Sequence, residues 1–594
     1  MTRANPLSDY EETAATPLSR RRFVEGVAAI GGIAALRPWR GAIAAPRQPV
    51  LSGTEFQLEI GPVPINVTGR PMIGIGINGL VPGPILRWRE GDTVTLAVTN
   101  RLSEPTSIHW HGLLLPNPMD GVPGLTFRGI APGETFVYRF PVVQSGTYWY
   151  HSHSGFQEPK GHYGAIVIEP KGGYPQAFDR DYVVFLSDWS DEEPETIISN
   201  LKFQADYYNF DQRTVGTFFA DVGRDGLKAT LADRAMWGEM RMSPTDSLDV
   251  TGATYTYLIN GQPPAANWTA LFHPGERVRL RFVNGSAMTI FDVRIPDLPM
   301  TIVQADGIDV EPVTVEQFRI SVAETYDFIV QPRDDRAFTI FVQPQDRTGF
   351  ARGTLAPLPG MTAPVPPMDP RPVRTMADMG MDHGGPGGTS STGRAAASGT
   401  DHAAMGHAAM GHGAAPAMAG MVAGTSGQQV PSGVGVDNFA MSPTERLNSP
   451  GEGFPPGRRV LTYADLRALK RGADPRPPSR EIILRLTGNM ERFMWGFDGK
   501  KFSEAAPIEL ARNERVRFVL INDTMMDHPI HLHGMFSELE NGHGEYRPLK
   551  HTINVKGGER LSFLVTAEFP GRWAFHCHLL FHMEAGMFRE VRVA

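Results

Sequence analysis

Three segments of the chain share one pattern of strand and turn residues, and this repeat constrains the fold more than any other feature. They read GDTVTLAVTN from Gly91, GERVRLRFVN from Gly275 and NERVRFVLIN from Asn513. Each alternates apolar and polar residues and follows an Asn-Gly or Asp-Gly turn, which is typical of β-strands. Gly and Pro are abundant, at 64 and 50 residues, and helical patterning is scarce. The sequence therefore predicts an all-β chain with three antiparallel β-sandwich domains of similar build.

The 594 residues are too many for one hydrophobic core, so several domains are expected. The predicted parts are a signal peptide at residues 1–45, domain 1 at 46–172, domain 2 at 173–358, a low-complexity segment at 359–456 and domain 3 at 457–594. The formal net charge of -8 is mild, and acidic and basic residues are interspersed. This charge pattern argues against nucleic acid or a membrane surface as a partner.

The N-terminus carries the pattern of a twin-arginine export signal. Arg20, Arg21 and Arg22 precede a weakly apolar stretch at residues 27–36, and residues 42–44 offer a small-residue cleavage site. A membrane anchor is the alternative, but an apolar run of about ten residues is too short to span a bilayer. We therefore expect the twin-arginine machinery to export the folded chain to the periplasm, with a mature N-terminus near Ala45 and no membrane span.

Four His-x-His pairs occupy matching positions in the first and third repeats. They are His109 and His111, His151 and His153, His531 and His533, and His576 and His578. The second repeat has Val293, Ile295, Phe341 and Gln343 at the equivalent positions. Residues i and i+2 of a strand project to the same side, so each pair can offer two imidazoles to one metal cluster. One such pair often lies harmlessly on a strand face, but four in register predict a metal cluster shared by domains 1 and 3.

The C-terminal segment HCHLLFHMEAGM contains Cys577, the only cysteine of the chain, so no intramolecular disulfide can form. A small buried hydrophobe is the alternative reading of a single cysteine. However, a trigonal His2Cys site with a weak axial methionine is the blue-copper arrangement, whereas zinc gains nothing from an axial thioether. The segment supplies Cys577, His582 and Met587, and the motif HPIHLHG supplies His528 as the second imidazole. Domain 1 has Ser152 where domain 3 has Cys577, so we expect a blue-copper site in domain 3 alone.

These motifs resemble those of the multicopper oxidases over nearly the whole mature chain. The resemblance implies cupredoxin-like domains and four copper ions, with His528, Cys577, His582 and axial Met587 binding the type 1 copper. It implies that His109 and His531 bind the type 2 copper. The type 3 pair then takes the remaining six histidines, which are His111, His151, His153, His533, His576 and His578. The implied reaction couples four one-electron oxidations of a reductant to the reduction of dioxygen to water.

An acid near the copper cluster is needed to deliver protons to oxygen. Asp120, in PMDGVPG, matches the position of the family's acidic residue near the type 2 copper. A turn aspartate before Gly121 is the alternative, since Asp-Gly is common turn chemistry. A second family acid usually follows the type 1 histidine directly, but this chain has Met583 there and Glu584 next. The second proton route is therefore open.

The segment at residues 359–456 is rich in Gly, Ala, Met and His and has little periodicity, so it is expected to be a disordered insert. Its methionines and histidines include Met376, Met379, Met381, Met405, Met410, Met418, Met421, His383, His402, His407 and His412. Thioethers are soft ligands that favour Cu(I). The repetition DHAAMGHAAMGHG favours binding of additional Cu(I), and a solvated linker with incidental methionines is the alternative.

Further stretches, among them RMSPTD, LTGNMERFMWGFDG and NDTMMDHPIHLHGM, are similar to the CopA-type copper-resistance oxidases of Gram-negative bacteria. The resemblance implies copper tolerance through oxidation of Cu(I) by dioxygen, through binding of excess copper, or through both. A laccase-like oxidation of phenols is a further alternative. Intact ligands for four coppers favour an enzyme over a sequestering protein, and we expect a monomer. The resemblance implies that domain segments near the family's substrate entrance are flanked by further methionines, and core packing explains each of them at least as well. They are Met236, Met240, Met242, Met490 and Met494.

Overall fold

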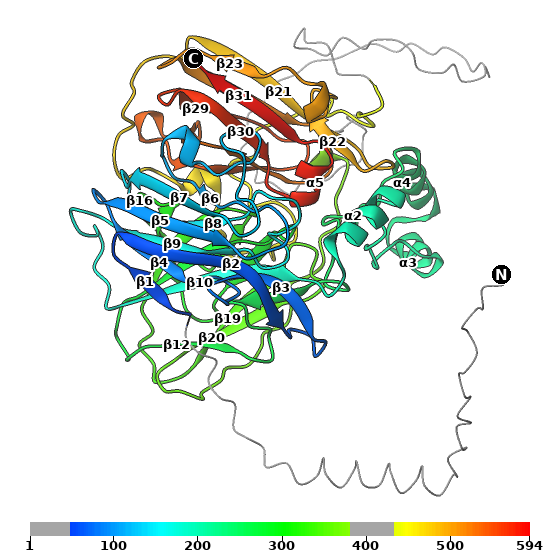
Figure 1. Cartoon of the computed structure of the whole chain (residues 1–594). Coiled ribbons are helices and arrows are strands. Elements are labelled where there is room, and N and C mark those ends of the chain that lie inside the picture. The colour runs from blue at the N-terminus through cyan, green and yellow to red at the C-terminus, as the bar shows by residue number, and fades with distance from the viewer. Residues whose placement is uncertain (1–47, 381–432) are drawn as a thin grey trace, which may run out of the picture. The chain divides into compact units, whose positions relative to one another are not determined.

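The computed structural model describes residues 48–380 and 433–594. The expected signal peptide and most of the Met/His-rich tract lie outside the described residues. Within them, the chain forms six β-sheets, two for each predicted domain, and Figure 1 shows the strands of the three domains as successive colours. The predicted all-β class with three sandwich domains is confirmed.

Domain 1 contains a four-stranded and a five-stranded sheet. Its strands are β1 (Val50–Ser52), β2 (Glu55–Ile65), β3 (Met72–Ile77), β4 (Ile85–Arg89), β5 (Thr93–Asn100), β6 (His109–His111), β7 (Thr135–Pro141), β8 (Gly146–His151) and β9 (Tyr163–Glu169). The strand orders are β3-β2-β5-β7 and β1-β4-β9-β8-β6. The repeat segment β5 alternates buried and less buried residues, as its sequence pattern requires for a strand with one face on the core.

Domain 2 contains a six-stranded and a five-stranded sheet. Its strands are β10 (Arg180–Trp189), β11 (Thr256–Ile259), β12 (Trp268–Leu271), β13 (Val278–Asn284), β14 (Phe291–Arg294), β15 (Met300–Ala305), β16 (Ile308–Val315), β17 (Gln317–Ile320), β18 (Thr325–Val330), β19 (Phe338–Pro344) and β20 (Ala351–Ala356). The orders are β11-β10-β13-β18-β15-β16 and β12-β20-β19-β14-β17. The repeat strand β13 is buried along its whole length, so both of its faces are covered.

Domain 3 repeats the strand order of domain 2. Its strands are β21 (Arg480–Asn489), β22 (Met494–Phe497), β23 (Ile508–Leu510), β24 (Arg515–Asn522), β25 (His528–Leu532), β26 (Ser537–Leu539), β27 (Leu549–Lys550), β28 (Thr552–Val555), β29 (Arg560–Thr566), β30 (Gly571–Cys577) and β31 (Phe588–Val593). The orders β22-β21-β24-β29-β26-β27 and β23-β31-β30-β25-β28 match those of domain 2 strand for strand.

Each sheet also contains parallel neighbours, which differs from the expected antiparallel build. Examples are the pairs β2–β5, β10–β13 and β21–β24, one in each domain. The alternation of apolar residues identifies a strand and its buried face, but it carries no information about the direction of the neighbouring strand.

The asparagine that ends each repeat strand ties two loops to the sheet. The side-chain amide of Asn284 donates to the carbonyls of Thr289 and Ile320 at 2.9 and 3.0 Å. That of Asn522 donates to Met526 and Val555 at 2.7 and 2.9 Å. Asn100 does the same in domain 1, with Glu104 and Ile130. A buried carbonyl without a partner is costly, so this residue holds the loop that leads into the next strand.

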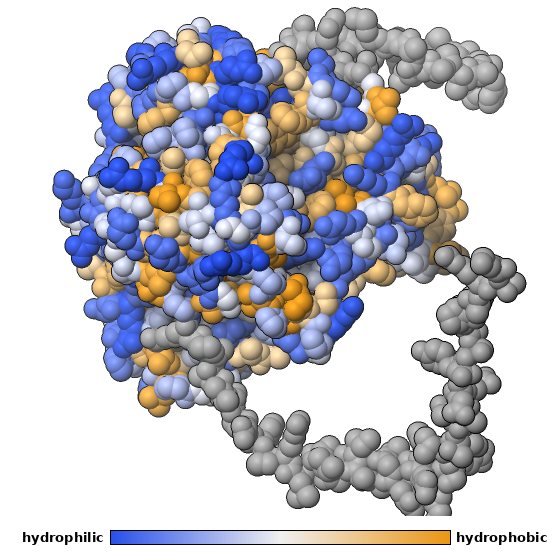
Figure 2. Space-filling model, viewed as in Figure 1, coloured by the Kyte–Doolittle hydropathy of each residue, from blue (hydrophilic) through white to orange (hydrophobic). Residues whose placement is uncertain are grey.

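The chain contains helices that the sequence pattern did not reveal. The helices α2 (Pro194–Phe203), α3 (Val215–Asp225) and α4 (Leu227–Glu239) form an insert between β10 and β11. A short helix, α5 (Leu580–Glu584), lies inside the C-terminal metal motif. The 3-10 helices are η1 (Asn117–Met119), η2 (Ala377–Met379), η3 (Tyr463–Asp465), η4 (Phe502–Glu504) and η5 (Gly544–Tyr546). The insert keeps apolar side chains exposed, including Phe203, Val215 and Phe219, and Figure 2 shows apolar surface on this side of the molecule.

The ends of the segment at 359–456 pack against domains 2 and 3, in contrast to the expected disorder. Arg374 is buried and its guanidinium lies 3.0 Å from the carboxylate of Asp527. The amide of Gln343 donates to the buried Asp369 at 2.6 Å. Charged groups are buried only when paired, so these contacts hold the N-terminal flank of the segment in place. The C-terminal flank is held by the backbone amides of Ala440 and Arg446, which donate to Asp523 and Glu559. The expectation of a disordered, copper-binding tract therefore concerns residues 381–432, which lie outside the described part.

The hydrophobic core has two parts. One cluster fills domain 1, around residues such as Trp88, Trp110 and Tyr138. The other is continuous through domains 2 and 3, and it includes Cys577 and Met587. No helix in the described part of the chain is long and apolar enough to cross a membrane.

Candidate metal centres

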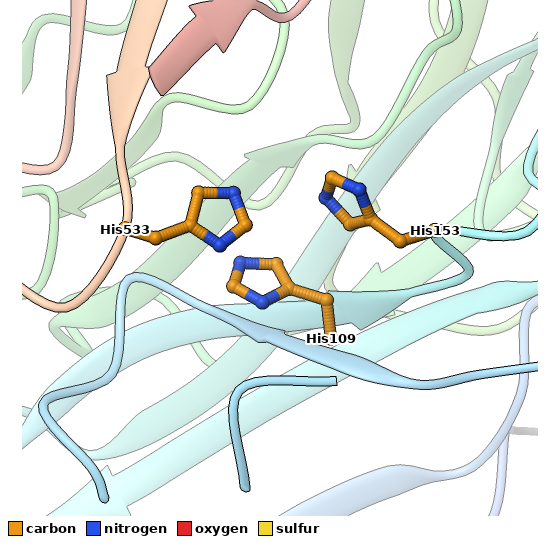
Figure 3. A group of neighbouring side chains, drawn as sticks. All are labelled: His109, His153 and His533. Carbon is orange, nitrogen blue, oxygen red and sulfur yellow. The ribbon is translucent and has the colours of Figure 1, made fainter. Parts of the chain in front are cut away.

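Strand register brings the four His-x-His pairs together between domains 1 and 3. In domain 1, β6 pairs with β8 so that His109 lies opposite His151. In domain 3, β25 pairs with β30 so that His531 lies opposite His576. The rings then meet across the domain boundary, because His109 stacks on His533 with centroids 4.0 Å apart and His111 stacks on His531 at 3.8 Å. Figure 3 shows the rings of His109, His153 and His533 converging from separate segments.

The inward nitrogens of these rings are available to bind metal. Among the described residues, a set of buried ring nitrogens has no hydrogen-bond partner: Nε2 of His109, His151, His153, His531 and His578, and Nδ1 of His111. The Nε2 atoms of His533 and His576 face each other at 3.1 Å. Three-residue groups close enough to share an ion include His111 with His151 and His578, and His109 with His153 and His533. Buried polar atoms are rarely left unpaired, so this arrangement fits several metal ions.

Burial keeps these imidazoles in the form that binds metal. Desolvation, reinforced by the neighbouring histidines, lowers the pKa of His111, His531 and His578 well below the usual value. Burial also lowers the pKa of His576 to about 4. A neutral imidazole has a free lone pair, so the cluster needs little proton release before it binds a cation.

Asp120 lies against two of the cluster histidines. His109 Nδ1 donates to the carbonyl oxygen of Asp120 at 2.7 Å, and the Nδ1 of His533 is 2.9 Å from its carboxylate. The residue therefore contacts one histidine from each domain. Asp120 also precedes a tight turn. Gly121 has φ of 85°, and a Cβ there would lie 1.8 Å from the carbonyl oxygen of Ile108. A position in a turn is therefore compatible with a carboxylate that contacts the cluster.

Other groups around the cluster were not singled out from the sequence. The carboxylate of Glu158 lies 2.5 Å from the Nδ1 of His151, and both side chains are buried. His551 and Thr552 each lie 3.2 Å from the Nε2 of His111. Glu158 follows a His-x-His pair at no distinctive spacing. His551 was identifiable only as one of the few histidines outside the motifs.

A second cluster lies in domain 3, formed by His528, Cys577 and His582. The Sγ of Cys577 is 3.5 Å from the Nδ1 of His528 and 3.9 Å from the Nδ1 of His582. Met587 is fully buried, and its backbone hydrogen-bonds to those of Cys577 and His582. Burial raises the pKa of the Cys577 thiol, so a nearby cation is needed to stabilise the thiolate. The donor set, two imidazoles and one thiolate with a thioether close by, fits a copper ion.

Domain 2 supplies a further contact to this second cluster. The Nε2 of His582 lies 2.7 Å from the carboxylate of Asp249, and both side chains are fully buried. The ring of Trp495 stacks on His582 with centroids 3.8 Å apart. These contacts orient the imidazole so that its Nδ1 faces Cys577. Asp249 lies three residues after the stretch RMSPTD, and sequence spacing could not relate it to His582.

The two clusters are joined through the backbone at Cys577. Cys577 lies between His576 and His578, whose rings belong to the larger cluster. The equivalent positions of domain 2 offer no imidazole or thiolate, because they hold Val293, Ile295, Phe341 and Gln343. All four side chains are buried. Of the methionines beyond the motifs, Met490 is buried and Met236 is exposed, so the described residues place them in different environments.

Comparison with known proteins places all three domains in one family. Models described as "Multicopper oxidase" match residues 59–173, 180–357 and 475–594. Copper resistance protein A of Escherichia coli is 55% identical, covering 97% of this chain and 99% of that protein. A copper resistance protein A homolog of Pseudomonas syringae pv. tomato is 56% identical with the same coverage.

Solved structures agree on the fold. Fet3p, described as a multicopper oxidase that functions in iron import, has a TM-score of 0.61 at 20% identity, covering 91% of this chain and 90% of that chain. A laccase from Botrytis aclada has a TM-score of 0.60 at 20% identity, covering 92% and 88%. The chain therefore belongs to the multicopper oxidases of the copper resistance protein A type, which are copper-containing oxidases that use dioxygen.

Proposed function

We propose that the protein is a periplasmic oxidase that converts Cu(I) to Cu(II) and thereby serves copper resistance. In the balanced reaction, four Cu(I), one dioxygen and four protons give four Cu(II) and two water molecules. The names of the two relatives support a role in copper resistance. Export by the twin-arginine machinery rests on Arg20 to Arg22, which lie outside the described residues, and we propose that the protein acts as a monomer.

Four copper ions fit the two clusters. The type 1 ion is assigned to His528, Cys577 and His582 with Met587 as the axial ligand, and the type 2 ion to His109 and His531. The type 3 pair is assigned to His111, His151 and His578 for one ion and to His153, His533 and His576 for the other, in keeping with the ring contacts. Bound copper would supply one-electron acceptance from the substrate and electron delivery to dioxygen.

The single observation that carries the proposal is the position of Cys577. Its Sγ belongs to the domain 3 cluster, while the residues on both sides of it belong to the cluster shared with domain 1. A protein that only stores copper has no need for a bonded connection between two metal clusters. An oxidase that collects electrons at one site and uses them at another does need it.

Two carboxylates have distinct roles in the proposal. Asp249 orients His582 at the site that accepts electrons from the substrate. Asp120 contacts His109 and His533 and is the proposed proton donor to oxygen, because it is the carboxylate that touches histidines of both domains. The neighbour of the type 1 histidine, Met583, cannot donate a proton. Glu158 is a second carboxylate beside the cluster.

Dioxygen consumption by the copper-loaded mature protein tests the proposed function. We expect uptake with Cu(I) as the reductant, in a ratio of one dioxygen to four Cu(I). A phenol serves as the second reductant and tests the laccase-like alternative. Binding of Cu(I) without dioxygen uptake would instead support a sequestering protein that acts mainly through its Met/His-rich tract.

Deletion of residues 381–432 separates the role of the tract from that of the copper centres. The deletion is limited to these residues because both flanks are packed, through Asp369 and Arg374 on one side and through Ala440 and Arg446 on the other. If the tract captures Cu(I), the variant loses more Cu(I) oxidation than phenol oxidation. Equal loss with both reductants would contradict a copper-specific role, and replacement of the tract by a Gly/Ser linker of equal length controls for chain length.

A further inference from the structure

Six histidines of the larger cluster have a ring nitrogen that is unpaired within the described residues, and in one of them this is a different nitrogen from that in the other five. In the described part of the chain, His111 leaves its Nδ1 unpaired and directs its Nε2 outward, whereas His109, His151, His153, His531 and His578 leave Nε2 unpaired. The outward Nε2 of His111 lies 3.2 Å from both the Nδ1 of His551 and the hydroxyl of Thr552. Residues 551 and 552 of domain 3 therefore determine which nitrogen this domain 1 histidine presents.

The same segment also contacts a histidine of domain 3. The Nδ1 of His531 donates to the carbonyl oxygen of His551 at 2.6 Å. His551 lies between β27 and β28, so its ring faces His111 while its carbonyl faces His531. Movement of His551 would therefore disturb the imidazole of His111 in domain 1 and that of His531 in domain 3. Gly112 reflects the closeness of this contact, since a Cβ there would lie 2.5 Å from the His551 ring.

A carboxylate of domain 2 holds the segment in place. The backbone amides of His551 and Thr552 both donate to Asp306 Oδ2 at 3.1 Å. The ammonium of Lys550 is 3.0 Å from Asp306 and 3.0 Å from Glu324, another carboxylate of domain 2. All three charged side chains are buried, and burial makes each of them costly unless the group stays paired. The pairing therefore favours one position of residues 550–552.

The turn that carries Asp306 also contacts domain 1. Asp306 and Gly307 connect β15 to β16 in left-handed conformations, with φ of 48° and 77°. A Cβ on Gly307 would lie 2.2 Å from the ring of Tyr148, which is on the strand β8 that ends at His151. The turn thus lies where all three domains meet.

We propose that Asp306 of domain 2 positions the copper cluster by holding residues 550–552 against His111 and His531. Domain 2 provides no ligand, and its contribution to this cluster is the placement of ligands from the other two domains. Asp306 and His551 are positioning residues, since neither belongs, among the residues that the structure describes, to a group of side chains close enough to share an ion. The inference rests on the proposed four-copper assignment.

The test compares copper loading at the two clusters in Asp306→Ala, His551→Leu and His551→Asn. Copper bound per chain, the blue absorption of the Cys577 site and the electron paramagnetic resonance signal of type 2 copper are measured after reconstitution. Loss of such outer contacts typically weakens metal binding about 10- to 100-fold. We therefore expect Asp306→Ala and His551→Leu to bind type 2 and type 3 copper about 10- to 100-fold more weakly, while the blue absorption remains. His551→Asn, whose amide can replace Nδ1, should retain most of this copper binding.

Asp327→Asn is the matched control. Asp327 is another fully buried carboxylate of domain 2 that contacts domain 1, through Thr147 at 2.9 Å, but it pairs with Arg279 and Arg281 rather than with residues 550–552. Normal loading of Asp306→Ala and His551→Leu, or equal copper loss in Asp327→Asn, would overturn the proposal. If Asp306→Ala does not fold, the two His551 variants decide. A wild-type protein that takes up only the blue copper would contradict the proposed function instead.

Discussion

Domains 2 and 3 have the same strand order but opposite relations to the metal centres. Both end the repeat strand with an asparagine that ties down two loops, at Asn284 and Asn522. Domain 3 contributes proposed ligands to both clusters, whereas domain 2 has buried core residues at the equivalent positions. Domain 2 nevertheless contacts His582 of the domain 3 cluster directly through Asp249, and it reaches the shared cluster indirectly through Asp306 and His551. The comparison shows that the shared fold uses the same asparagine hydrogen bonds in both domains. The candidate metal ligands occupy other positions, which differ between the domains without a change in strand order.

The largest effect is expected from Cys577→Ser, which removes the one residue that most distinguishes domain 3 from the other two. A hydroxyl is a poor substitute for a thiolate at a blue-copper site, so the blue absorption and dioxygen uptake should both disappear. Type 2 and type 3 copper should still load, because the larger cluster keeps all eight histidines. Copper analysis and absorption spectroscopy measure this directly. A blue, active Cys577→Ser protein would refute the assignment.

Asp249→Asn tests the contribution of domain 2 to the domain 3 cluster. The amide keeps the size of the side chain but loses the negative charge beside His582. We expect Cu(I) oxidation to fall about tenfold or more, with the blue copper still bound. Steady-state dioxygen uptake and the blue absorption report the two properties separately.

Asp246→Asn is the matched control, since Asp246 is also buried and near Asp249 but has no contact with His582 among the described residues. Burial raises the pKa of Asp246 well above its usual value, so this substitution changes a buried carboxyl group without touching His582. Equal losses in both variants would show that any change to a buried carboxyl group of this region, rather than loss of the contact with His582, is responsible.

The smallest effects are expected from Asn284→Ala and Asn522→Ala, which remove the equivalent pair of side-chain hydrogen bonds from domains 2 and 3. Each variant leaves two buried carbonyls without their donor, at a cost of about 1–3 kcal/mol in the free energy of unfolding. Calorimetry on the copper-free protein should show similar losses of stability. Only Asn522→Ala should also alter copper loading, because its loop leads to His528. Copper loss in Asn284→Ala as well would contradict the idea that these structural hydrogen bonds and the metal-binding positions act separately.

The sequence was sufficient for features that repeat or follow strand periodicity. The strands β5, β13 and β24 and the four His-x-His pairs could be recognised because a period of two places alternate residues on one face. Parallel pairing could not be recognised, because a strand pattern is silent about the neighbour's direction. The helical insert was also missed, since α4 shows no continuous apolar face and buries only Thr230 and Trp237.

The supporting residues of the two centres were harder to predict than the ligands. Asp249 and His582 are 333 positions apart, and Asp306 and His551 are 245 apart. Such pairs meet only through the arrangement of domains, which no local pattern encodes. Asp120 was recognisable because it follows a ligand motif closely and matches a family position. Spacing within a motif therefore predicts candidate ligands, whereas the residues that orient them become visible only through contacts between domains.

The hydrogen bond between the backbone amide of Ser442 and the carbonyl of Gly380, 2.9 Å long, has a consequence for how this family member can vary. It joins the two described flanks of residues 381–432, so both ends of the intervening sequence are tied to each other by the fold itself. The entropic cost of closing a connection between two fixed points grows only slowly with its length. We therefore expect related chains to differ in length at this position with little effect on the stability of the folded domains.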